Sequence, residues 1–335
     1  MHRTSRRLLG GLLALAVVDL SACSSDDGGD AAAAASGEGW SFTDDLGTTV
    51  ELDAAPERIA AINDVASSLW NYGVAPVATF GQTSTADDVA FEGRDLSDVE
   101  ILGESYGDID LEQLAAAAPD VIITTVYPTD SEGTLDESEP LYGFESIEQQ
   151  EQIGRIAPII AVAWSGSASD VIERTAELAG ALGADMESEE VRAAEADFEA
   201  ASTALTDAAA GGLTVLPVAA YADEGFYMAK SEDEPSLRMY GELGVQFVDP
   251  GGEDYYWQTA GWEDVPQYPS DIILYSLRGA LTPEQMAEQP TYELLPAAQA
   301  DQVHPWKYIG MDYAAQAAYM EELAGWLSGS QDVTS

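Results

Sequence analysis

The stretch LEQLAAAAPDVIITTVY, residues 111–127, decides the fold class of this chain. Its first part is rich in alanine and has Glu112 near the start, which favours a short helix that Pro119 ends. Residues 121–124 are a continuous apolar run rich in β-branched side chains, as expected of a strand covered on both faces. The stretch therefore predicts one helix–strand unit of an α/β fold.

The same arrangement returns in WEDVPQYPSDIILYSLR, residues 262–278. Both stretches place a Glu eight positions before an Asp that leads into an apolar run, and a large polar side chain seven positions after that Asp. These positions are Glu112, Asp120 and Tyr127 in the first stretch and Glu263, Asp271 and Arg278 in the second. Such a repeat suggests two similar lobes, although two unrelated helix–strand units could also match by chance.

Short apolar runs alternate with helical patterns along most of the chain, which predicts α/β lobes with parallel sheets. A hairpin is expected at residues 42–52. Strands are expected at residues 59–62, 77–80, 100–102, 121–124, 159–162, 213–218, 226–229, 246–248, 272–275 and 302–304. Further helices are expected at residues 65–72, 147–156, 188–210 and 313–327.

One predicted helix, residues 167–183, lies between the two repeats. Ser167 or Ser169 can cap its start, apolar residues recur at helical spacing, and Gly183 ends it. About sixteen helical residues would span about 24 Å. We therefore expect a connecting helix, residues 167–184, that joins an N-terminal lobe, residues 40–166, to a C-terminal lobe, residues 185–330, and restricts their hinge motion.

The composition excludes some classes of partner. The 335 residues, of which 46% are hydrophobic, suffice for one large domain or two of ordinary size. The formal charge of −49 repels nucleic acid and anionic membrane surfaces. The charge does not identify a cationic ligand, because a heavily solvated surface or adaptation to salt gives the same composition.

The N-terminus has the pattern of a bacterial export signal. Arg3, Arg6 and Arg7 precede an apolar core at residues 8–18 that is short for a membrane span. The sequence LSAC at residues 20–23 resembles the lipobox of bacterial lipoproteins, in which the Cys receives diacylglycerol after cleavage before it. We expect residues 1–22 to be a signal peptide, either Sec or twin-arginine, and Cys23 to anchor the protein at the extracytoplasmic face of the cell membrane.

An ordinary signal peptide with an incidental cysteine is the alternative. Cys23 is the only cysteine, so an intramolecular disulfide and a Cys-based metal site are excluded. The following low-complexity run, SSDDGGDAAAAASGEG, cannot bury enough apolar surface to fold. Residues 23–39 are therefore expected to be a lipidated cysteine and a flexible tether. Without residues 1–22 the chain keeps 9 basic and 60 acidic residues.

From about residue 42 to residue 327 the sequence resembles the substrate-binding proteins of ABC importers for iron-siderophores, haem and cobalamin. Five segments carry the resemblance, in order: residues 43–62, 110–124, 152–162, 170–183 and 290–306. It implies two α/β lobes joined by a single long helix, a ligand cleft between them, and a monomer that delivers its ligand to a permease. It also implies that Glu112 and Glu263 dock to arginines of the permease; the alternative is solvated glutamates favoured by the helix dipole.

The candidate ligand site follows from the strands, because ligands of open α/β sheets lie outside the carboxyl ends of the strands. Asn63, Gln82 and Tyr256 follow predicted strands, as do the residues that we expect to bind ligand: Tyr127, Trp164, Tyr221, Tyr255, Trp257, Tyr275 and Arg278. Aromatic rings with polar tips suit a large, partly apolar ligand. For the other tyrosines a core or surface role is an equal alternative, whereas for Trp257, Tyr275 and Arg278 we favour ligand binding.

Charge points to the kind of ligand. Many siderophore binders have an Arg a few residues before the position of Glu112, where this chain has Tyr106. A trianionic catecholate chelate would need more positive charge than Arg278 alone supplies. We therefore expect a neutral or cationic ferric siderophore, most simply of the hydroxamate type, with iron present only as part of the ligand and no other cofactor.

Other functions stay open or are excluded. Haem or cobalamin is the alternative ligand, since His304 or a tyrosine could ligate haem iron, and a sensor or adhesion lipoprotein is a further class. A bare metal is not expected, because the related zinc and manganese binders use several histidines and this chain has two, one of them in the signal. Gly-Ser-Ala at residues 166–168 is no nucleophile elbow, and the chain has no P-loop and no G-x-G-x-x-G, so we expect no enzyme.

Overall fold

The computed structural model describes residues 39–335, so the predicted signal peptide, Cys23 and nearly all of the tether lie outside the described residues. The description begins with an antiparallel hairpin of β1 (Trp40–Thr43) and β2 (Thr49–Leu52), close to the prediction. Asp44 shapes its turn, because Oδ1 accepts the backbone N–H groups of Leu46 at 3.0 Å and Thr48 at 2.8 Å.

The first sheet is parallel throughout, as predicted. Its strands lie in the order β5-β4-β3-β6-β7: β5 (Glu100–Ile101), β4 (Ala78–Phe80), β3 (Ile59–Ile62), β6 (Val121–Val126) and β7 (Ile159–Ala163). All of β3, β4 and β6 is buried, which explains their continuous apolar runs. The helices α1 (Asn63–Asn71), α2 (Leu111–Ala117) and α3 (Ile147–Ile153) connect these strands.

The second sheet is mixed. It contains β8 (Thr214–Tyr221), β9 (Gly225–Ala229), β10 (Gln246–Phe247), β11 (Trp257–Ala260), β12 (Ile272–Ser276) and β13 (Val303–Trp306). The order is β11-β9-β8-β12-β13, with β10 also paired to β8. Strands β10, β12 and β13 are parallel to their neighbours, whereas β9 and β11 are antiparallel to theirs.

The prediction of purely parallel strands was wrong at β9, and β11 was not predicted. A short turn joins β8 to β9, and only antiparallel neighbours can be joined so directly. Gly225 makes this turn possible: its φ is +96°, and a Cβ there would lie 2.1 Å from the carbonyl oxygen of Ala260. The strand β11, WQTA, escaped prediction because it is short and has no apolar run.

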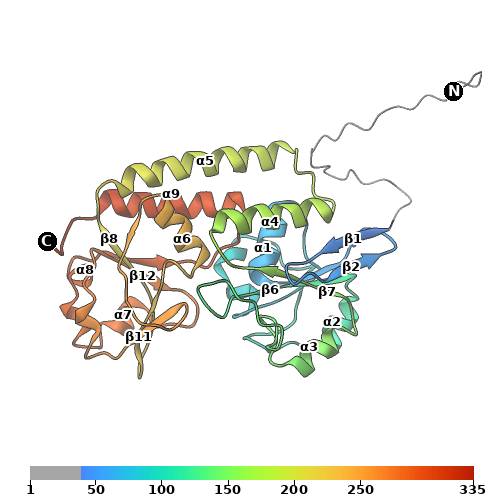
Figure 1. Cartoon of the computed structure of the whole chain (residues 1–335), viewed down its shortest axis with the longest axis horizontal. Helices are drawn as coiled ribbons and strands as arrows, with labels where there is room; N and C mark the ends of the chain where they lie inside the picture. Colours follow the sequence, from blue (N-terminus) through green and yellow to red (C-terminus); the bar gives the residue numbers. More distant parts are fainter. Residues whose placement is uncertain (1–38) are drawn as a thin grey trace, which may run out of the picture. The chain divides into compact units, whose positions relative to one another are not determined.

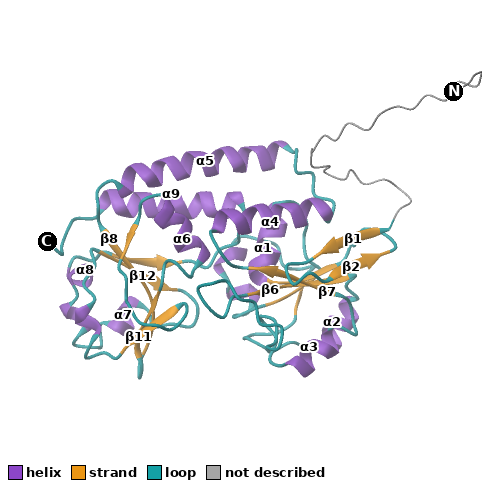
Figure 2. Cartoon of the chain, in the orientation of Figure 1, coloured by secondary structure: helices purple, strands orange, loops and turns teal. Residues whose placement is uncertain are grey.

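Helices connect the two sheets along one side of the molecule. The helices that follow β7 in the chain are α4 (Ala168–Ala181), α5 (Glu189–Ala209), α6 (Pro235–Glu242), α7 (Pro283–Met286), α8 (Pro296–Gln299) and α9 (Tyr313–Gly329). The predicted connecting helix is α4, which follows β7 and packs against α1 of the first lobe and α6 of the second. Figure 1 shows α5 lying along α9, and Figure 2 shows the strands in two separate groups.

The two repeats occupy equivalent places in the two sheets. Asp120 precedes β6, and its Oδ2 accepts the N–H of Arg58, just before the neighbouring strand β3, at 2.9 Å. Asp271 precedes β12, and its Oδ2 accepts the N–H of Thr214, the first residue of the neighbouring strand β8, at 2.8 Å. The repeated Asp therefore ties the starts of two central strands together in each lobe.

The helical part of the second repeat was predicted wrongly. The first repeat has the helix α2, but the second has a short 3₁₀ turn, Val265–Gln267. Pro266 and Pro269 explain the difference, since neither can donate the backbone hydrogen bond that a longer helix would need.

Candidate functional site

A cavity of about 450 Å³ lies where the carboxyl ends of strands from both sheets meet. Its lining residues are Gln82, Tyr127, Tyr142, Trp164, Ala219, Tyr221, Tyr227, Glu234, Tyr255, Tyr256, Trp257, Ser276, Arg278 and Tyr308. Tyr127 and Trp164 directly follow β6 and β7, and Tyr221 and Ser276 end β8 and β12. The position agrees with the rule that ligands of open α/β sheets bind beyond the carboxyl ends of the strands.

Six of the seven residues predicted to bind ligand line this cavity: Tyr127, Trp164, Tyr221, Tyr255, Trp257 and Arg278. Tyr275 does not line it. Neighbouring side chains of a strand point to opposite faces, so when Ser276 faces the cavity, Tyr275 faces the other side, where it lies near Glu284 and Tyr292. The sequence pattern therefore placed Tyr275 at the correct end of β12 but on the wrong face.

Several lining residues were not predicted, and two of them matter most. Tyr142 lies far from any strand end in sequence, but its backbone N–H donates to the carbonyl oxygen of Thr125 at 3.1 Å, which holds it beside β6. Glu234 caps the start of α6, a helix that sequence analysis missed. The signal for this helix was present, since Pro235 occupies its first position and proline is favoured there.

Aromatic side chains form a wall on each side of the cavity. In the first lobe the ring centroids of Tyr127 and Tyr142 are 4.8 Å apart, and those of Tyr127 and Trp164 are 6.0 Å apart. In the second lobe Trp257 lies between Tyr256 at 4.9 Å and Tyr227 at 6.3 Å. Edge-to-face and tilted contacts of this kind hold large rings in defined orientations, so much of the protein surface that would contact a ligand is preformed.

A strained loop carries the second wall. Tyr256 has φ of +65°, a conformation that costs a non-glycine residue about 1–2 kcal/mol. The N–H of Tyr256 donates to the Asp233 carboxylate at 3.1 Å, and the carbonyl oxygen of Tyr256 accepts the N–H of Lys230 at 2.9 Å. The side chain of Lys230 also bonds the carbonyl oxygens of Gly252 and Asp254. These contacts stabilise the conformation that directs Tyr256 and Trp257 to the cavity.

Burial keeps four tyrosine hydroxyls of the cavity protonated at neutral pH. Burial raises the pKa of Tyr142 to about 12, with a counteracting contribution from Arg278, and it raises the pKa of Tyr255 to about 12. Burial also raises the pKa of Tyr127 and Tyr256 well above the ordinary value. These groups therefore offer neutral O–H donors and acceptors, and burial opposes the phenolate form that would ligate iron directly.

The charged residue of greatest interest, Arg278, already has a partner. Its Nη1 and Nη2 both donate to the carboxylate of Asp64, the second residue of α1 in the other lobe, with the Nη1–Oδ2 distance at 3.3 Å. The Asp64 side chain is only 3% exposed and that of Arg278 13%. The guanidinium also lies over the ring of Tyr308, 4.5 Å from its centroid. The expected free cation is thus part of a buried, neutral pair.

Glu234 is the other charged residue among those lining the cavity within residues 39–335. Its Oε2 accepts hydrogen bonds from Ser236 Oγ and from the N–H of Leu237, both at 2.6 Å. Burial raises the pKa of the Glu234 carboxyl, and hydrogen bonds from Ser236 and Leu237 and the field of Arg278 oppose that effect. Asp88, near Arg278 and Asp64, also has a raised pKa because it is buried.

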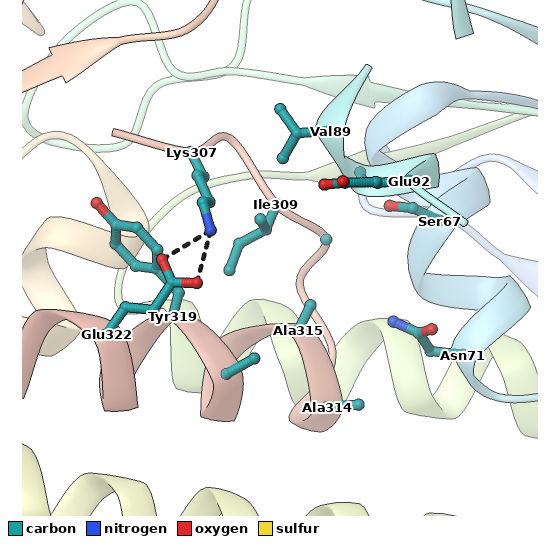
Figure 3. A pocket seen from close by; sticks show the side chains of 13 residues that line it. Ser67, Asn71, Val89, Glu92, Lys307, Ile309, Ala314, Ala315, Tyr319 and Glu322 are labelled. Carbon is teal, nitrogen blue, oxygen red and sulfur yellow. Dashed lines mark hydrogen bonds and ion pairs between the residues drawn. The ribbon is translucent and has the colours of Figure 1, made fainter. Parts of the chain in front are cut away.

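Other hollows carry weaker indications of a ligand. Figure 3 shows one between α1 and α9, where Lys307 Nζ is held by both carboxylate oxygens of Glu322, at 2.6 and 2.7 Å. Lys307 therefore already has a counter-charge in this hollow. Within residues 39–335 no group of three or more His, Cys, Asp or Glu side chains is placed to hold a metal ion.

The remaining predicted residues lie outside the cavity. Glu112, in the first turn of α2, and Glu263, just before the 3₁₀ turn, are both exposed. His304 stacks on Trp326 of α9, with 4.7 Å between ring centroids, and does not line the cavity, so it cannot ligate haem iron there. Across residues 39–335, no helix combines the length and the apolar character needed to cross a membrane.

Comparisons with known proteins agree with this architecture. The family described as periplasmic binding protein matches residues 78–308. No curated protein matches the chain. DesE, a ferric-siderophore receptor protein from Streptomyces coelicolor, is 31% identical, with a TM-score of 0.79 over 88% of this chain and 99% of that one.

Two further solved structures are similar. The siderophore periplasmic binding protein of the fuscachelin gene cluster of Thermobifida fusca is 25% identical, with a TM-score of 0.57 over 82% of this chain and 98% of that one. FhuD2 of Staphylococcus aureus with bound ferrioxamine B shares the fold at 17% identity, with a TM-score of 0.54 over 81% of this chain and 98% of that one. The resemblance drawn from sequence is confirmed: the chain belongs to the periplasmic binding protein family.

Proposed function

We propose that this protein is the extracytoplasmic solute-binding component of an ABC importer and that it binds a ferric siderophore of the hydroxamate type for delivery to the permease. The observation that carries this proposal is the aromatic cavity between the two lobes, in which Arg278 is neutralised by Asp64. Such a cavity suits a large chelate without strong negative charge. The ferric-siderophore receptor of Streptomyces coelicolor, similar over nearly its whole length, supports a ferric siderophore as the ligand.

The chemistry of the lining favours a complete iron chelate over iron that needs a ligand from the protein. The buried tyrosines retain their protons, and His304 lies elsewhere. A ferric trihydroxamate brings all six iron ligands itself and presents carbonyl oxygens and methylene chains, which tyrosine hydroxyls and aromatic faces can contact. A volume of about 450 Å³ lies in the ordinary range of ligand pockets.

A fluorescence titration tests the proposal, because Trp164 and Trp257 line the cavity and should be quenched by bound iron chelate. The panel is ferrioxamine B, ferric enterobactin as a trianionic catecholate, haemin and cobalamin. We expect saturable quenching by ferrioxamine B and binding at least tenfold weaker for ferric enterobactin. Tight binding of haemin or cobalamin with none of ferrioxamine B would refute the ligand class and leave the family assignment intact.

Anchoring and docking complete the proposal. Cys23 would carry the lipid and hold the folded residues at the outer face of the membrane, with the protein acting as a monomer. Membrane fractionation and mass spectrometry test this: Cys23→Ser should release the protein or leave it unprocessed, and an unchanged fraction and mass would contradict it. Glu112 and Glu263, both exposed and outside the cavity, are the proposed contacts to the permease.

A further inference from the structure

The charges at the cavity define what kind of ligand it can accept. Within residues 39–335 the lining holds two charged residues, Arg278 and Glu234. The charge of Arg278 is cancelled by the buried carboxylate of Asp64. When Glu234 is ionised the cavity is negative, and when Glu234 is protonated the cavity is neutral. In neither state does the cavity hold a net positive charge, so it offers an anionic group no counter-charge.

Glu234 has an acceptor to spare. Both hydrogen bonds that it accepts within residues 39–335, from Ser236 and Leu237, go to Oε2, and none goes to Oε1. The residue is only 4% exposed, so bulk water solvates the carboxylate poorly. The nearest lysine in sequence, Lys230, is bound to carbonyl oxygens of Gly252 and Asp254 and is not available as a partner.

A carboxylate in this position costs free energy to ionise, as the upward displacement of its pKa by burial indicates. A cation brought by the ligand would offset that cost and would gain a charge-assisted hydrogen bond in a poorly solvated place. The helix cap alone does not require ionised Glu, because a neutral side-chain oxygen caps a helix as well. The cap of α6 therefore leaves the negative charge of Glu234 and its second carboxylate oxygen available to a ligand.

We propose that Glu234 is the counter-charge for a cationic group of the ligand, such as the terminal ammonium of a linear trihydroxamate chelate. This inference rests on the proposed function, since it assigns a specificity-determining residue within the same cavity. The aromatic walls hold the chelate, and Glu234 distinguishes chelates that carry a primary ammonium from equally shaped chelates that do not.

Two probes that share one iron centre test the proposal. Ferrioxamine B carries a terminal ammonium, and its N-acetyl derivative carries a neutral amide at the same atom. A charge-assisted hydrogen bond of this kind corresponds to about a tenfold or larger difference in dissociation constant. We expect the wild-type protein to bind ferrioxamine B at least about tenfold more tightly than the acetylated chelate, as measured by fluorescence quenching or calorimetry.

Glu234→Gln should reduce that preference to less than about threefold, because the amide oxygen can still cap α6 but cannot carry the counter-charge. Glu232→Gln is the matched control, since it removes the same charge from an exposed side chain two residues earlier and should keep the preference. Any steric effect of the acetyl group is the same in all three proteins, so the change in ratio isolates the charge.

Three results would overturn the inference. The wild-type protein could bind both chelates equally, or Glu234→Gln could keep the full preference; in both cases the proposed function stands and the role of Glu234 is lost. If neither chelate binds, the proposed function and this inference fail together. The wild-type comparison needs no variant, so the proposal stays testable even if Glu234→Gln does not fold.

Discussion

Arg278 and Asp64 form a buried ion pair across the cleft although 214 positions separate them in sequence. Arg278 lies two residues after the end of β12, and Asp64 is the second residue of α1, the helix that follows β3. The pair therefore does two things at once: it joins the lobes at the cavity, and it removes the positive charge that would otherwise attract anionic chelates.

Breaking this pair should destabilise the protein and change its ligand preference. Asp64→Asn leaves the guanidinium buried without a counter-charge, which costs about 3–5 kcal/mol of unfolding free energy. The same substitution makes the cavity more positive by one charge, so binding of ferric enterobactin should strengthen relative to ferrioxamine B. Urea unfolding and the quenching titration measure the two effects.

Arg155→Gln is the control for that experiment. Arg155 pairs with Glu151, but both side chains are more than half exposed, so its loss should change stability by less than about 1 kcal/mol. The double variant Asp64→Asn with Arg278→Met should be more stable than Asp64→Asn alone, because the buried guanidinium that lost its paired carboxylate is then removed. Equal stability of Asp64→Asn and the wild type would contradict the assignment of a buried pair.

Trp257 should be an anchor for the ligand. Trp257→Ala removes a ring that lies between Tyr227 and Tyr256 in the cavity wall, and the loss should be on the order of 1–3 kcal/mol in binding free energy. Trp326→Phe is a suitable control, because Trp326 stacks on His304 and does not line the cavity. Isothermal calorimetry with ferrioxamine B measures the dissociation constant of each variant. Equal dissociation constants for both variants would contradict a role of Trp257 in binding.

Glu112 and Glu263 should affect uptake and not affinity. Replacing both with Ala should lower iron uptake by cells several-fold while the dissociation constant of the purified protein stays unchanged, because neither side chain lines the cavity. Glu148 and Glu293 are exposed glutamates of the two lobes and serve as a control pair. Uptake at the wild-type rate in the Glu112 and Glu263 variant would mean that the permease contacts other residues.

Asp312 should make the protein less stable as the pH rises. Its Oδ2 is buried without a hydrogen-bond partner among residues 39–335, and burial raises its pKa from the ordinary value to about 6. A carboxyl with a raised pKa in the folded state favours folding while protonated. That contribution is fully present below the unfolded-state pKa of about 3.9 and is lost as the pH rises through about 6.

Asp312→Asn should therefore match the wild type below about pH 4 and exceed it by about 2–3 kcal/mol above about pH 7. The Asn side chain can keep the Oδ1 acceptor that caps α9 through the N–H of Ala315. Urea unfolding of both proteins from pH 4 to pH 8 gives the difference at each pH. A difference that is constant across this range would show that Asp312 does not titrate as its burial implies.

The sequence predicted the fold better than it predicted the site. Continuous apolar runs such as residues 121–124 were enough to place the buried parallel strands, because such strands contact other elements on both faces. The antiparallel strand β11 was missed because it has four residues and no apolar run, and the helix α6 of eight residues was missed although Pro235 marks its start. In the second repeat Pro266 and Pro269 accompany a short 3₁₀ turn where the pattern predicted a helix, which shows that single residues can override the overall pattern.

The residues that line the cavity were predicted from sequence where they directly follow a buried strand. Tyr127 and Trp164 were found because they follow buried strands directly, and Tyr275 was assigned to the wrong face because a one-residue step reverses the side chain. Tyr142 and Glu234 come from a loop and a helix start that only tertiary contacts bring to the cavity. The partner of Arg278 could not be predicted, since nothing in local sequence connects it to Asp64.

The turn of the hairpin β1–β2 covers the edge strand β7 of the first sheet, which affects how these molecules behave when they are crowded at a surface. Asp44 Oδ2 accepts the N–H of Ala161, Asp45 Oδ2 accepts the N–H of Ala163, and the N–H of Asp45 donates to the carbonyl oxygen of Ala161. These bonds occupy the outer side of β7, one edge of the first sheet, and β5 at the opposite edge is only two residues long. Another copy would find little strand to pair with at the edges of the first sheet, so we expect crowded molecules to resist edge-to-edge aggregation through this sheet.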